Sequence, residues 1–292
     1  MSSSLRDRAV ADGEEMSRLA RFHVGRIASS DMAARDHDRV DPLSLFSLDG
    51  RVAIVTGASS GLGARFARVL DSVGASVLLV ARREDRLAEL ASELRNAHVV
   101  GADLSNELAR ERVVAATIER FGRVDVLVNN AGIGNTAGIE DESLDSFRFA
   151  MELNVTAMWH LSKLCAPSMI ETGSGAIVNV ASMLGHVGST PVKQANYCAS
   201  KGAVINLTRE LALQWARKGV RVNALSPGWF LSEMTEGMDT DEGSVRFVQA
   251  NAPLARMGYA DELDGALLLL ASPAGGYITG HSLLIDGGWT AR

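Results

Sequence analysis

The chain has 292 residues, of which 47% are hydrophobic and 22% are charged, a composition typical of a globular protein with a full hydrophobic core. Its formal net charge of −6 argues against a nucleic-acid partner, since surfaces that bind a phosphate backbone are rich in Lys and Arg. No apolar run approaches the ~20 residues that a membrane-spanning helix requires, so we expect no membrane partner.

Residues 1–48 differ from the rest of the chain. They mix arginines with a similar number of acids and lack a continuous apolar segment, which is unlike a secretory signal or an acid-poor transit peptide. We therefore expect an N-terminal extension, with one short helix near 14–28, followed by a single domain over 49–292.

From Arg51 onward, short runs rich in β-branched residues alternate with longer segments of helical periodicity. This alternation predicts right-handed βαβ crossovers and an α/β fold, a doubly wound parallel sheet of about seven strands with helices on both faces. Each run reads as a buried strand. The runs cover residues 51–57, 75–81, 97–103, 124–132, 175–182, 220–228 and 281–288.

The first predicted strand is followed by the glycine-rich stretch "TGASSGLG", residues 56–63. Its glycines allow a sharp turn and a close approach to a pyrophosphate, whose charge the N-terminus of the next helix would meet. A stretch of this kind between a strand and a helix predicts a Rossmann-type dinucleotide site. The residues concerned are Gly57, Ser59, Ser60, Gly61, Leu62 and Gly63.

A tyrosine and a lysine lie four residues apart in "ANYCASKGAV" (195–204). At this spacing on a helix, Tyr197 and Lys201 share one face. A neighbouring ammonium favours the phenolate, so we expect the pKa of Tyr197 to be lowered and the pair to act as a general acid or base.

Together with "NNAG" (129–132), Ser182 and "SPG" (226–228), these motifs resemble the short-chain dehydrogenase/reductase family, from about Ser47 to Trp289. The resemblance implies NAD(P)-dependent conversion between an alcohol and a carbonyl compound. It makes Tyr197 the proton donor or acceptor and Lys201 its partner, which also binds the nicotinamide ribose. Ser182 would hold the substrate oxygen, and Asn154 would hold a water in a proton relay.

The end of the second predicted strand bears on cofactor choice. NAD-preferring relatives usually carry an acid there for the ribose 2′-hydroxyl, whereas this chain has Ala81 followed by Arg82 and Arg83. We therefore predict NADP(H), held chiefly by Arg82. NAD(H) stays an alternative, because Ser59 and Ser60 stand where some NADP-using relatives have a basic residue.

The resemblance extends the cofactor site to other loops, while Asn129 is expected to tie strands together. The further cofactor-binding residues it implies are Asp103, Leu104, Asn130, Ala131, Gly132, Pro227, Gly228, Phe230 and Ser232, together with Tyr197 and Lys201.

Residues 229–258 read as two short helices that form a substrate lid, and His186 is a candidate substrate contact. The sequence of this region resembles gluconate 5-dehydrogenase-type and other sugar-acid or polyol members of the family, so we expect the substrate to be a sugar acid, a polyol or a small ketone. A 3-oxoacyl-carrier-protein reductase is the alternative enzyme, although the acidic lid disfavours an acidic carrier. A non-catalytic nucleotide-binding scaffold is the alternative from another class.

Two further expectations concern the state of the protein. Cys165 and Cys198 lack metal-ligand spacing, so we interpret them as buried thiols of a reducing cytosol and expect a cytoplasmic enzyme without a metal site. Helices around 105–121, 144–170 and 195–217 carry more apolar surface than one sheet face requires, which predicts a homodimer or homotetramer. Trp289 would contribute to a second two-fold contact.

Overall fold

A computed structural model describes residues 41–231, 233–235 and 237–291 of the chain. The described residues from Pro42 onward belong to one compact unit, and Leu48 is buried in its core. The predicted helix near 14–28 lies outside the described residues, so the assignment of 1–48 as an extension stays a prediction. No helix in the described part of the chain is long and apolar enough to cross a membrane.

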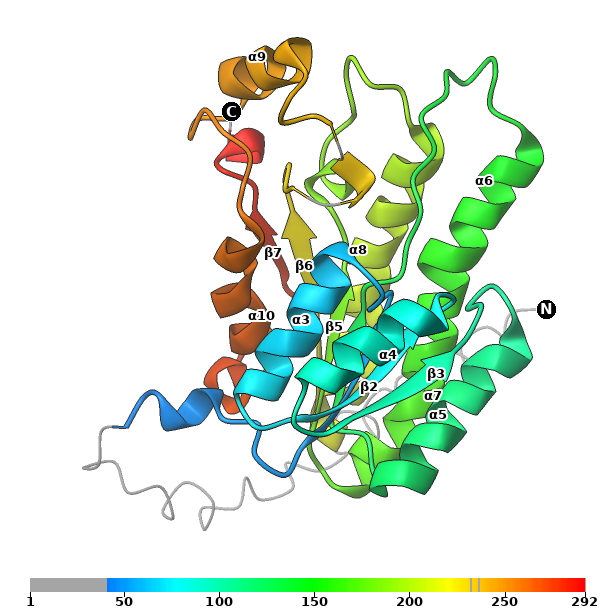
Figure 1. Cartoon of the computed structure of the whole chain (residues 1–292), viewed down its shortest axis with the longest axis vertical. Coiled ribbons are helices and arrows are strands. Elements are labelled where there is room, and N and C mark those ends of the chain that lie inside the picture. Colours follow the sequence, from blue (N-terminus) through cyan, green and yellow to red (C-terminus); the bar gives the residue numbers. More distant parts are fainter. Residues whose placement is uncertain (1–40, 232, 236, 292) are drawn as a thin grey trace, which may run out of the picture. The chain divides into compact units, whose positions relative to one another are not determined.

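Seven parallel strands form one sheet in the order β3-β2-β1-β4-β5-β6-β7, which confirms the predicted α/β fold (Figure 1). The strands are β1 Val52–Thr56, β2 Ser76–Ala81, β3 Ala97–Gly101, β4 Val126–Asn129, β5 Gly175–Val180, β6 Val220–Pro227 and β7 Ser282–Ile285. Because every neighbouring pair is parallel, all seven end at the same edge. The strand order reverses between β1 and β4, which is where ligands bind in such sheets.

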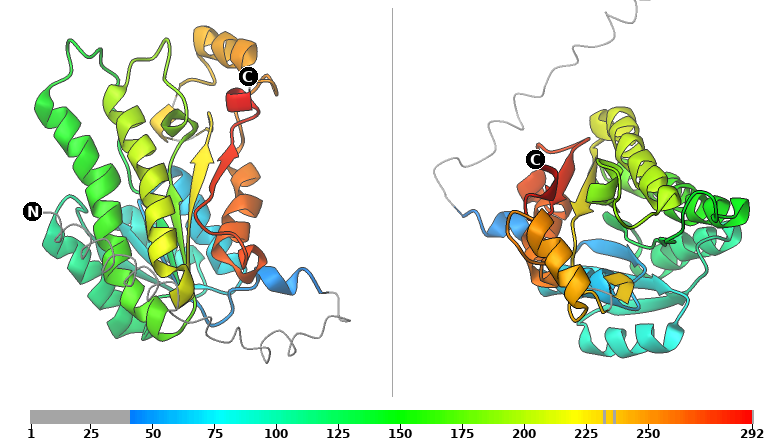
Figure 2. Two further views of the ribbon diagram at one scale, coloured as in Figure 1. Left: turned by 180° about the vertical axis from the view of Figure 1, so that it is seen from behind. Right: turned by 90° about the horizontal axis from the view of Figure 1, so that it is seen from above.

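Helices cover both faces of the sheet. α3, α4 and α10 pack on the face turned toward the viewer in Figure 1, whereas α5, α7 and α8 pack on the other, seen from behind in Figure 2. The α-helices are α3 Gly61–Ser72, α4 Glu84–Glu93, α5 Glu107–Phe121, α6 Leu144–Met151, α7 Ala157–Glu171, α8 Ala195–Trp215, α9 Glu242–Asn251 and α10 Asp264–Ala271.

The boundaries of α5 illustrate how local sequence sets these helices. The side chain of Asn106 accepts a hydrogen bond from the Ala109 amide and caps the first turn. Gly122 ends the helix with φ +82°, and its amide donates to the Ile118 carbonyl, a conformation that glycine adopts without the penalty of a Cβ.

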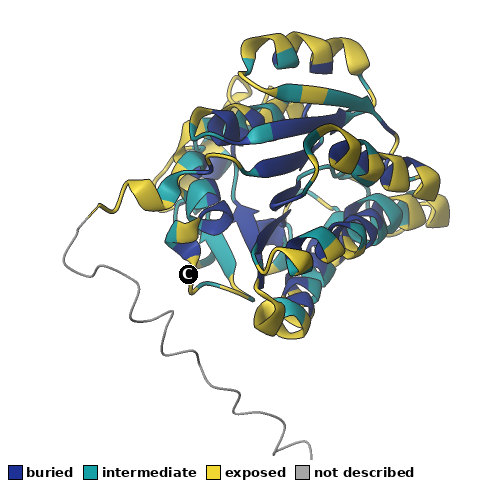
Figure 3. Ribbon diagram, turned by 90° about the horizontal axis from the view of Figure 1, so that it is seen from below, coloured by how far each residue is buried: buried dark blue, intermediate teal, exposed yellow. Residues whose placement is uncertain are grey.

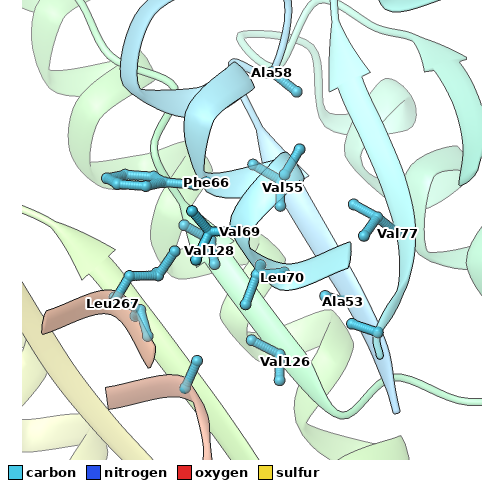
Figure 4. Close-up of a cluster of buried hydrophobic side chains, with 14 of the residues drawn as sticks. Ala53, Val55, Ala58, Phe66, Val69, Leu70, Val77, Val126, Val128 and Leu267 are labelled. Carbon is cyan, nitrogen blue, oxygen red and sulfur yellow. The ribbon is translucent and has the colours of Figure 1, made fainter. Parts of the chain in front are cut away.

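The core lies between the sheet and each helical layer (Figure 3). In the close-up of Figure 4, Phe66 and Leu70 of α3 face Val55 of β1 and Val128 of β4, with Leu267 of α10 beside them. All five side chains are buried. The central strands β1, β4 and β5 are buried throughout, as expected for parallel strands covered on both faces.

Two of the predicted buried strands are only half-buried. β3 and β7 are the edges of the sheet, and their residues are mostly of intermediate exposure, with His98 of β3 exposed. The interpretation of all seven runs as buried strands is therefore wrong for these two, because an edge strand has a neighbour on one side only.

The segment between β6 and α10 contains the two short helices predicted for the lid, the 3₁₀ turn η5 Glu233–Thr235 and helix α9. It leaves β6 and returns beside its own start, where the Gly258 amide donates a 2.8 Å hydrogen bond to the Trp229 carbonyl. Figure 1 shows α9 beyond the carboxyl ends of β6 and β7. The segment thus lies at the edge of the sheet where a ligand is expected.

Candidate active site

A cleft of about 730 Å³ opens at the carboxyl edge of the sheet. The structure brings nearly all predicted site residues to its wall. These are Gly57, Ser59, Ser60, Gly61, Leu62, Gly63, Ala81, Arg82, Arg83, Asp103, Leu104, Asn130, Ala131, Gly132, Ser182, Tyr197, Lys201, Pro227, Gly228 and Phe230. Of the other two, Asn154 lies behind the wall and Ser232 lies outside the described residues.

The glycine-rich turn passes directly from β1 into α3. Gly57 has φ +67°, and a Cβ on Gly63 would lie 2.2 Å from the Gly57 carbonyl oxygen, so side chains are excluded where the turn packs on its own helix. α3 begins at Gly61 with its N-terminus at the cleft. Free amides at a helix N-terminus bind phosphate, and this cradle therefore fits the pyrophosphate of a dinucleotide.

Thr56 and Asn130 hold the turn in place. The Thr56 hydroxyl accepts hydrogen bonds from the amides of Asn130 (2.9 Å) and Ala131 (3.0 Å), and the Asn130 side chain donates to the Thr56 carbonyl (2.9 Å). No role was predicted for Thr56, although this residue opens the glycine-rich stretch. Asn130 positions the loop through its side chain in addition to lining the cleft.

Ser182, Tyr197 and Lys201 come together from two elements. Ser182 follows β5 and caps the 3₁₀ turn η3 Met183–Gly185, with its hydroxyl accepting from the Leu184 amide. Tyr197 and Lys201 lie in the first two turns of α8, and the Lys201 ammonium is 5.5 Å from the centre of the tyrosine ring. The predicted i, i+4 pair therefore shares one face of the helix, and the face looks into the cleft.

The acid–base properties of this group differ from the expectation. Burial raises the pKa of Tyr197, and a hydrogen bond from Ser182 offsets this only in part. Burial also lowers the pKa of Lys201 to about 8, so the ammonium stays mostly charged at neutral pH and loses its charge in mildly alkaline solution. The expectation of a lowered pKa for Tyr197 is therefore wrong here, because desolvation is the largest influence on the phenol.

Asn154 lies in a π-helical turn, η2 Glu152–Thr156, between α6 and α7; such turns often occur at functional sites. The side chain is fully buried. Its amide nitrogen donates to the Ile133 carbonyl (2.8 Å) and to Ser200 Oγ (2.9 Å), and its oxygen accepts from the Ile133 amide (2.8 Å). A Cβ on Gly132 would lie 3.1 Å from the Asn154 oxygen and 3.5 Å from Lys201 Nζ, so both groups approach the same glycine.

An anion-binding group forms where β2 meets the glycine-rich turn, and Arg83 is its centre. Arg83 Nη2 donates to the hydroxyls of Ser59 (3.0 Å) and Ser60 (2.7 Å). Its guanidinium also forms two 3.0 Å hydrogen bonds to Glu233 of the predicted lid. Arg82, the predicted main contact, also lines the cleft. Its charge acts on the carboxylate of Asp103, whose pKa is lowered mainly by hydrogen bonds from Ser105.

Three side chains considered in the sequence lie outside the cleft wall. His186 Nε2 is 2.9 Å from Ser282 Oγ of β7, so the structure gives no support to a substrate contact. Cys165 is buried, and burial raises the pKa of its thiol to about 12. Cys198 is only partly buried, which corrects its interpretation as a buried thiol; the start of α8 leaves this side of the helix partly open.

One group in the described part of the chain has the composition of a metal site. Glu107, Glu111 and His160 place ligand atoms within 4.8 Å of one another. Arg110 lies beside them and donates to His160 Nδ1 (3.1 Å), and this fixed positive charge opposes a metal cation. The group lies on α5 and α7 and is not part of the cleft wall.

The known proteins that this chain resembles are dehydrogenases and reductases. A family model described as enoyl-(acyl carrier protein) reductase matches residues 57–290. Galactitol 2-dehydrogenase (L-tagatose-forming) of Cereibacter sphaeroides is 39% identical over 253 residues, 86% of this chain and 99% of that protein. Gluconate 5-dehydrogenase of Gluconobacter oxydans is 38% identical over 250 residues, 84% and 97% of the two chains. A 3-oxoacyl-[acyl-carrier-protein] reductase of Vibrio cholerae is 35% identical over 243 residues, 83% and 98% of the two chains.

Solved structures agree with these relatives. The crystal structure of a gluconate 5-dehydrogenase from Burkholderia cenocepacia, in complex with NADP and tartrate, has a TM-score of 0.82 and 33% identity. It covers 86% of this chain and 100% of that one. NADP is the cofactor that the strand end of this sequence predicts. With its fold, its cleft and these relatives taken together, the chain belongs to the short-chain dehydrogenase/reductase family, whose members are NAD(P)-dependent oxidoreductases.

Proposed function

We propose that this protein interconverts a neutral polyol and its ketone with NADP(H). The observation that carries the proposal is the meeting of Ser182, Tyr197 and Lys201 in the same cleft as the glycine-rich cradle. A hydride donor bound on the cradle and a proton donor on α8 would then face one substrate carbon and its oxygen.

Bound NADP(H) would supply or accept the hydride. Tyr197 would hold the proton at its phenolic oxygen, giving it to the carbonyl in reduction and taking it from the alcohol in oxidation. The Ser182 hydroxyl would hold the same substrate oxygen and stabilise the charge that develops on it. Asn154 and Lys201, which meet at Gly132, would pass the proton onward to water.

Cofactor preference follows from the anion-binding group. A phosphate monoester is bound by the same donors that now hold the Glu233 carboxylate, a guanidinium fork and serine hydroxyls. Ala81 at the end of β2 provides no carboxylate for a ribose 2′-hydroxyl. These contacts support NADP(H) over NAD(H).

The charge of the cleft supports a neutral substrate. Its positively charged lining residues are Arg82, Arg83 and Lys201, all three of which the proposal assigns to cofactor. The acids Asp103 and Glu233 also line the cleft, and the other polar residues of the wall, such as Thr136, Gln194 and Thr235, are uncharged. Because a buried carboxylate requires a compensating cation, a polyol fits this wall better than a sugar acid.

Steady-state kinetics with NADP⁺ and NADPH test this proposal. We expect galactitol or another neutral polyol to have at least a tenfold higher kcat/KM than gluconate, with NADP⁺ preferred over NAD⁺. A tenfold preference for gluconate would contradict the substrate assignment and leave the oxidoreductase assignment intact. Binding of NADPH without turnover of any polyol, sugar acid or ketone would favour the scaffold alternative.

The carrier-protein reductase alternative is tested in the same panel with a 3-oxoacyl thioester. An acidic carrier protein requires a basic docking surface, whereas the exposed acids Asp241 and Glu242 begin α9 at the lid. We therefore expect the thioester to be a poorer substrate than the polyol.

A further inference from the structure

Glu233 occupies the anion-binding group of the cofactor cleft with a carboxylate from the chain itself. Four hydrogen bonds hold it: from Ser60 Oγ (2.6 Å), from Arg83 Nη1 and Nη2 (3.0 Å each) and from Arg86 Nη1 (2.6 Å). Together, Ser60, Arg83 and Arg86 are called the anion site below. Through these contacts a residue of the substrate lid reaches the opposite end of the cleft, about 150 positions away in the sequence.

The contacts of Glu233 are more numerous than those of a single ion pair, and its side chain stays 48% exposed. Both carboxylate oxygens are used, and the Arg83 fork meets them in parallel while a serine hydroxyl donates to one of them. These hydrogen bonds, those from Arg83 and Ser60 above all, lower the pKa of Glu233 to about 2. The carboxylate is therefore ionised at any pH at which the protein would be studied.

We infer that Glu233 determines cofactor specificity by competing with the 2′-phosphate of NADP(H) for the anion site. This inference rests on the proposed NADP(H) function. A phosphate and a carboxylate cannot share the donors of Arg83 and Ser60, since each needs the same fork and like charges repel at contact distance. NAD(H) carries no charge at this position and leaves Glu233 in place.

The same competition couples the cofactor to the lid. Glu233 begins η5, and Thr235 and Met238, which follow it, line the cleft. The Met238 amide donates to the Thr235 carbonyl (3.0 Å), so these two residues lie close together. The Thr235 hydroxyl also donates to the Phe230 carbonyl (2.5 Å). Displacement of Glu233 by a phosphate therefore removes one of the attachments of this segment, whereas a cofactor without the phosphate leaves that attachment in place.

Calorimetric titration with two nucleotide probes tests the competition without any turnover. The probes are adenosine 2′,5′-bisphosphate, which carries the 2′-phosphate, and 5′-AMP, which lacks it. In Glu233→Gln, which keeps the size of the side chain, we expect the bisphosphate to bind at least about fivefold more tightly than in the wild type, with 5′-AMP binding changed less than twofold.

Glu242→Gln is the matched control. Glu242 is an exposed acid of the same lid segment, hydrogen-bonded to Arg246 (3.2 Å) on α9, and it is not part of the cleft wall. The Glu242→Gln substitution removes the same charge from the lid and is expected to leave the affinities for the bisphosphate and for 5′-AMP unchanged. An equal gain in Glu242→Gln would attribute the effect to net charge and overturn the role of Glu233.

Hydrogen exchange provides the second readout. In the wild type, saturation with the bisphosphate should speed exchange of the amides of 238–241 relative to saturation with 5′-AMP, and Glu233→Gln should show the faster exchange with either probe. Unchanged bisphosphate affinity in Glu233→Gln, weaker affinity, or identical exchange with both probes would each overturn the inference. Failure of the bisphosphate to bind both the wild type and Glu233→Gln would also overturn the inference. If the wild type then still oxidised a polyol with NAD⁺, the oxidoreductase assignment would stand.

Discussion

The ammonium of Lys201 donates a 2.7 Å hydrogen bond to the carbonyl oxygen of Val180, the last residue of β5. This bond joins the start of α8 to the strand that carries Ser182 two residues later. It fixes the distance between the two elements from which the proposed acid–base group is built. Lys201 therefore positions these two elements, in addition to the cofactor contact proposed for it.

Tyr197→Phe tests the proton donor directly. The ring keeps its packing, and only the phenolic proton is lost, so we expect kcat to fall at least about a hundredfold while NADPH affinity changes less than twofold. Stopped-flow reduction and fluorescence titration measure the two quantities. Tyr259→Phe, an exposed tyrosine outside the cleft wall, is the control. A mutant with more than about a tenth of wild-type kcat, a barrier change below ~1.4 kcal/mol, would exclude Tyr197 as the acid.

The lowered pKa of Lys201 has a consequence for stability. Because the folded-state pKa is about 8 against an ordinary 10.5, the unfolded chain binds more protons between these values, and stability from this group rises as the pH increases through that window. Relative to Lys201→Met, we expect the wild-type free energy of unfolding to rise by about 2–3 kcal/mol from pH 7.5 to pH 10.

Urea unfolding of both proteins at the two pH values measures this difference. Lys218→Met, which removes an exposed lysine, reports the effect of losing one positive charge at the surface. A wild-type minus Lys201→Met difference that stays constant with pH would show that Lys201 is fully protonated in the folded protein throughout.

A buried chain of polar side chains joins the middle of the sheet to α8. Asn129 Nδ2 of β4 donates to Asn179 Oδ1 of β5 (2.9 Å), and Asn179 Nδ2 donates to Thr208 Oγ1 (3.0 Å). The expectation that Asn129 ties strands together is confirmed. Asn179→Ala removes one buried hydrogen bond from each partner, while Asn129 keeps its bond to Ser162 Oγ (3.1 Å) and Thr208 keeps its bond to the Val204 carbonyl (2.8 Å). We expect the substitution to destabilise the fold by about 2–4 kcal/mol.

Urea midpoints at unchanged m-value check this prediction. Asn96→Ala is the control, because Asn96 is exposed and its amide contacts only Ser76 (2.7 Å) among the described hydrogen bonds. Equal losses in the two variants would mean that burial adds nothing to the value of the Asn179 contacts.

The sequence predicted the elements of this fold better than their ends. The predicted strand 124–132 is in fact β4, Val126–Asn129, because the chain beyond Asn129 turns toward Thr56, whose hydroxyl takes the next two amides. Hydrophobic periodicity predicts which residues are buried, but it does not predict a hydrogen bond between neighbouring strand ends such as the one that Thr56 accepts.

The same limit applies to the site. Motif spacing placed Tyr197, Lys201 and Ser182 correctly in one cleft, since each follows from a strand end or a helix face. The contact between Arg83 and Glu233 joins positions that share no motif, and no local pattern distinguishes Glu233 from the other acids of the lid. Desolvation of Tyr197 was missed for a related reason: it depends on contacts from outside α8, such as Gly134, where a Cβ would lie 3.1 Å from the ring.

Association into a homodimer or homotetramer stays a prediction. Helices α6, α7 and α8 expose Phe149, Trp159 and Leu213, the last to 79%, and such apolar surface marks an interface. The ring of Trp289 packs within this chain, 5.5 Å from that of Phe247 and 6.0 Å from that of Trp229, which leaves less of it for the predicted second contact.

Light scattering at micromolar concentration should give at least twice the 31.0 kDa of one chain. Leu213→Arg should shift the protein toward the monomer. Leu43→Arg, at a residue equally exposed at 79% but on a different part of the unit, should leave the mass unchanged. A monomeric wild type would refute the prediction.

The final prediction separates the two arginines that follow β2. Charge-assisted contacts of a guanidinium with a phosphate contribute ~1.5–3 kcal/mol, which is about ten- to a hundredfold in affinity. The sequence assigned this contact to Arg82, but the hydrogen bonds to Ser59 and Ser60 belong to Arg83. We therefore expect Arg83→Ala to weaken NADPH binding at least about tenfold with little effect on NADH, and Arg82→Ala to have a smaller effect on NADPH.

Ala81→Asp combined with Arg83→Ala should reverse the preference for NADPH over NADH, since the new carboxylate would repel the phosphate and accept a hydrogen bond from the ribose hydroxyl of NADH. Fluorescence titration with both cofactors measures each case, with Arg68→Ala as the control, because Arg68 pairs with Glu93 (2.7 Å) outside the cleft wall. A larger loss in Arg82→Ala than in Arg83→Ala would return the contact to Arg82, and equal binding of NADH and NADPH by the wild type would refute the assignment to both.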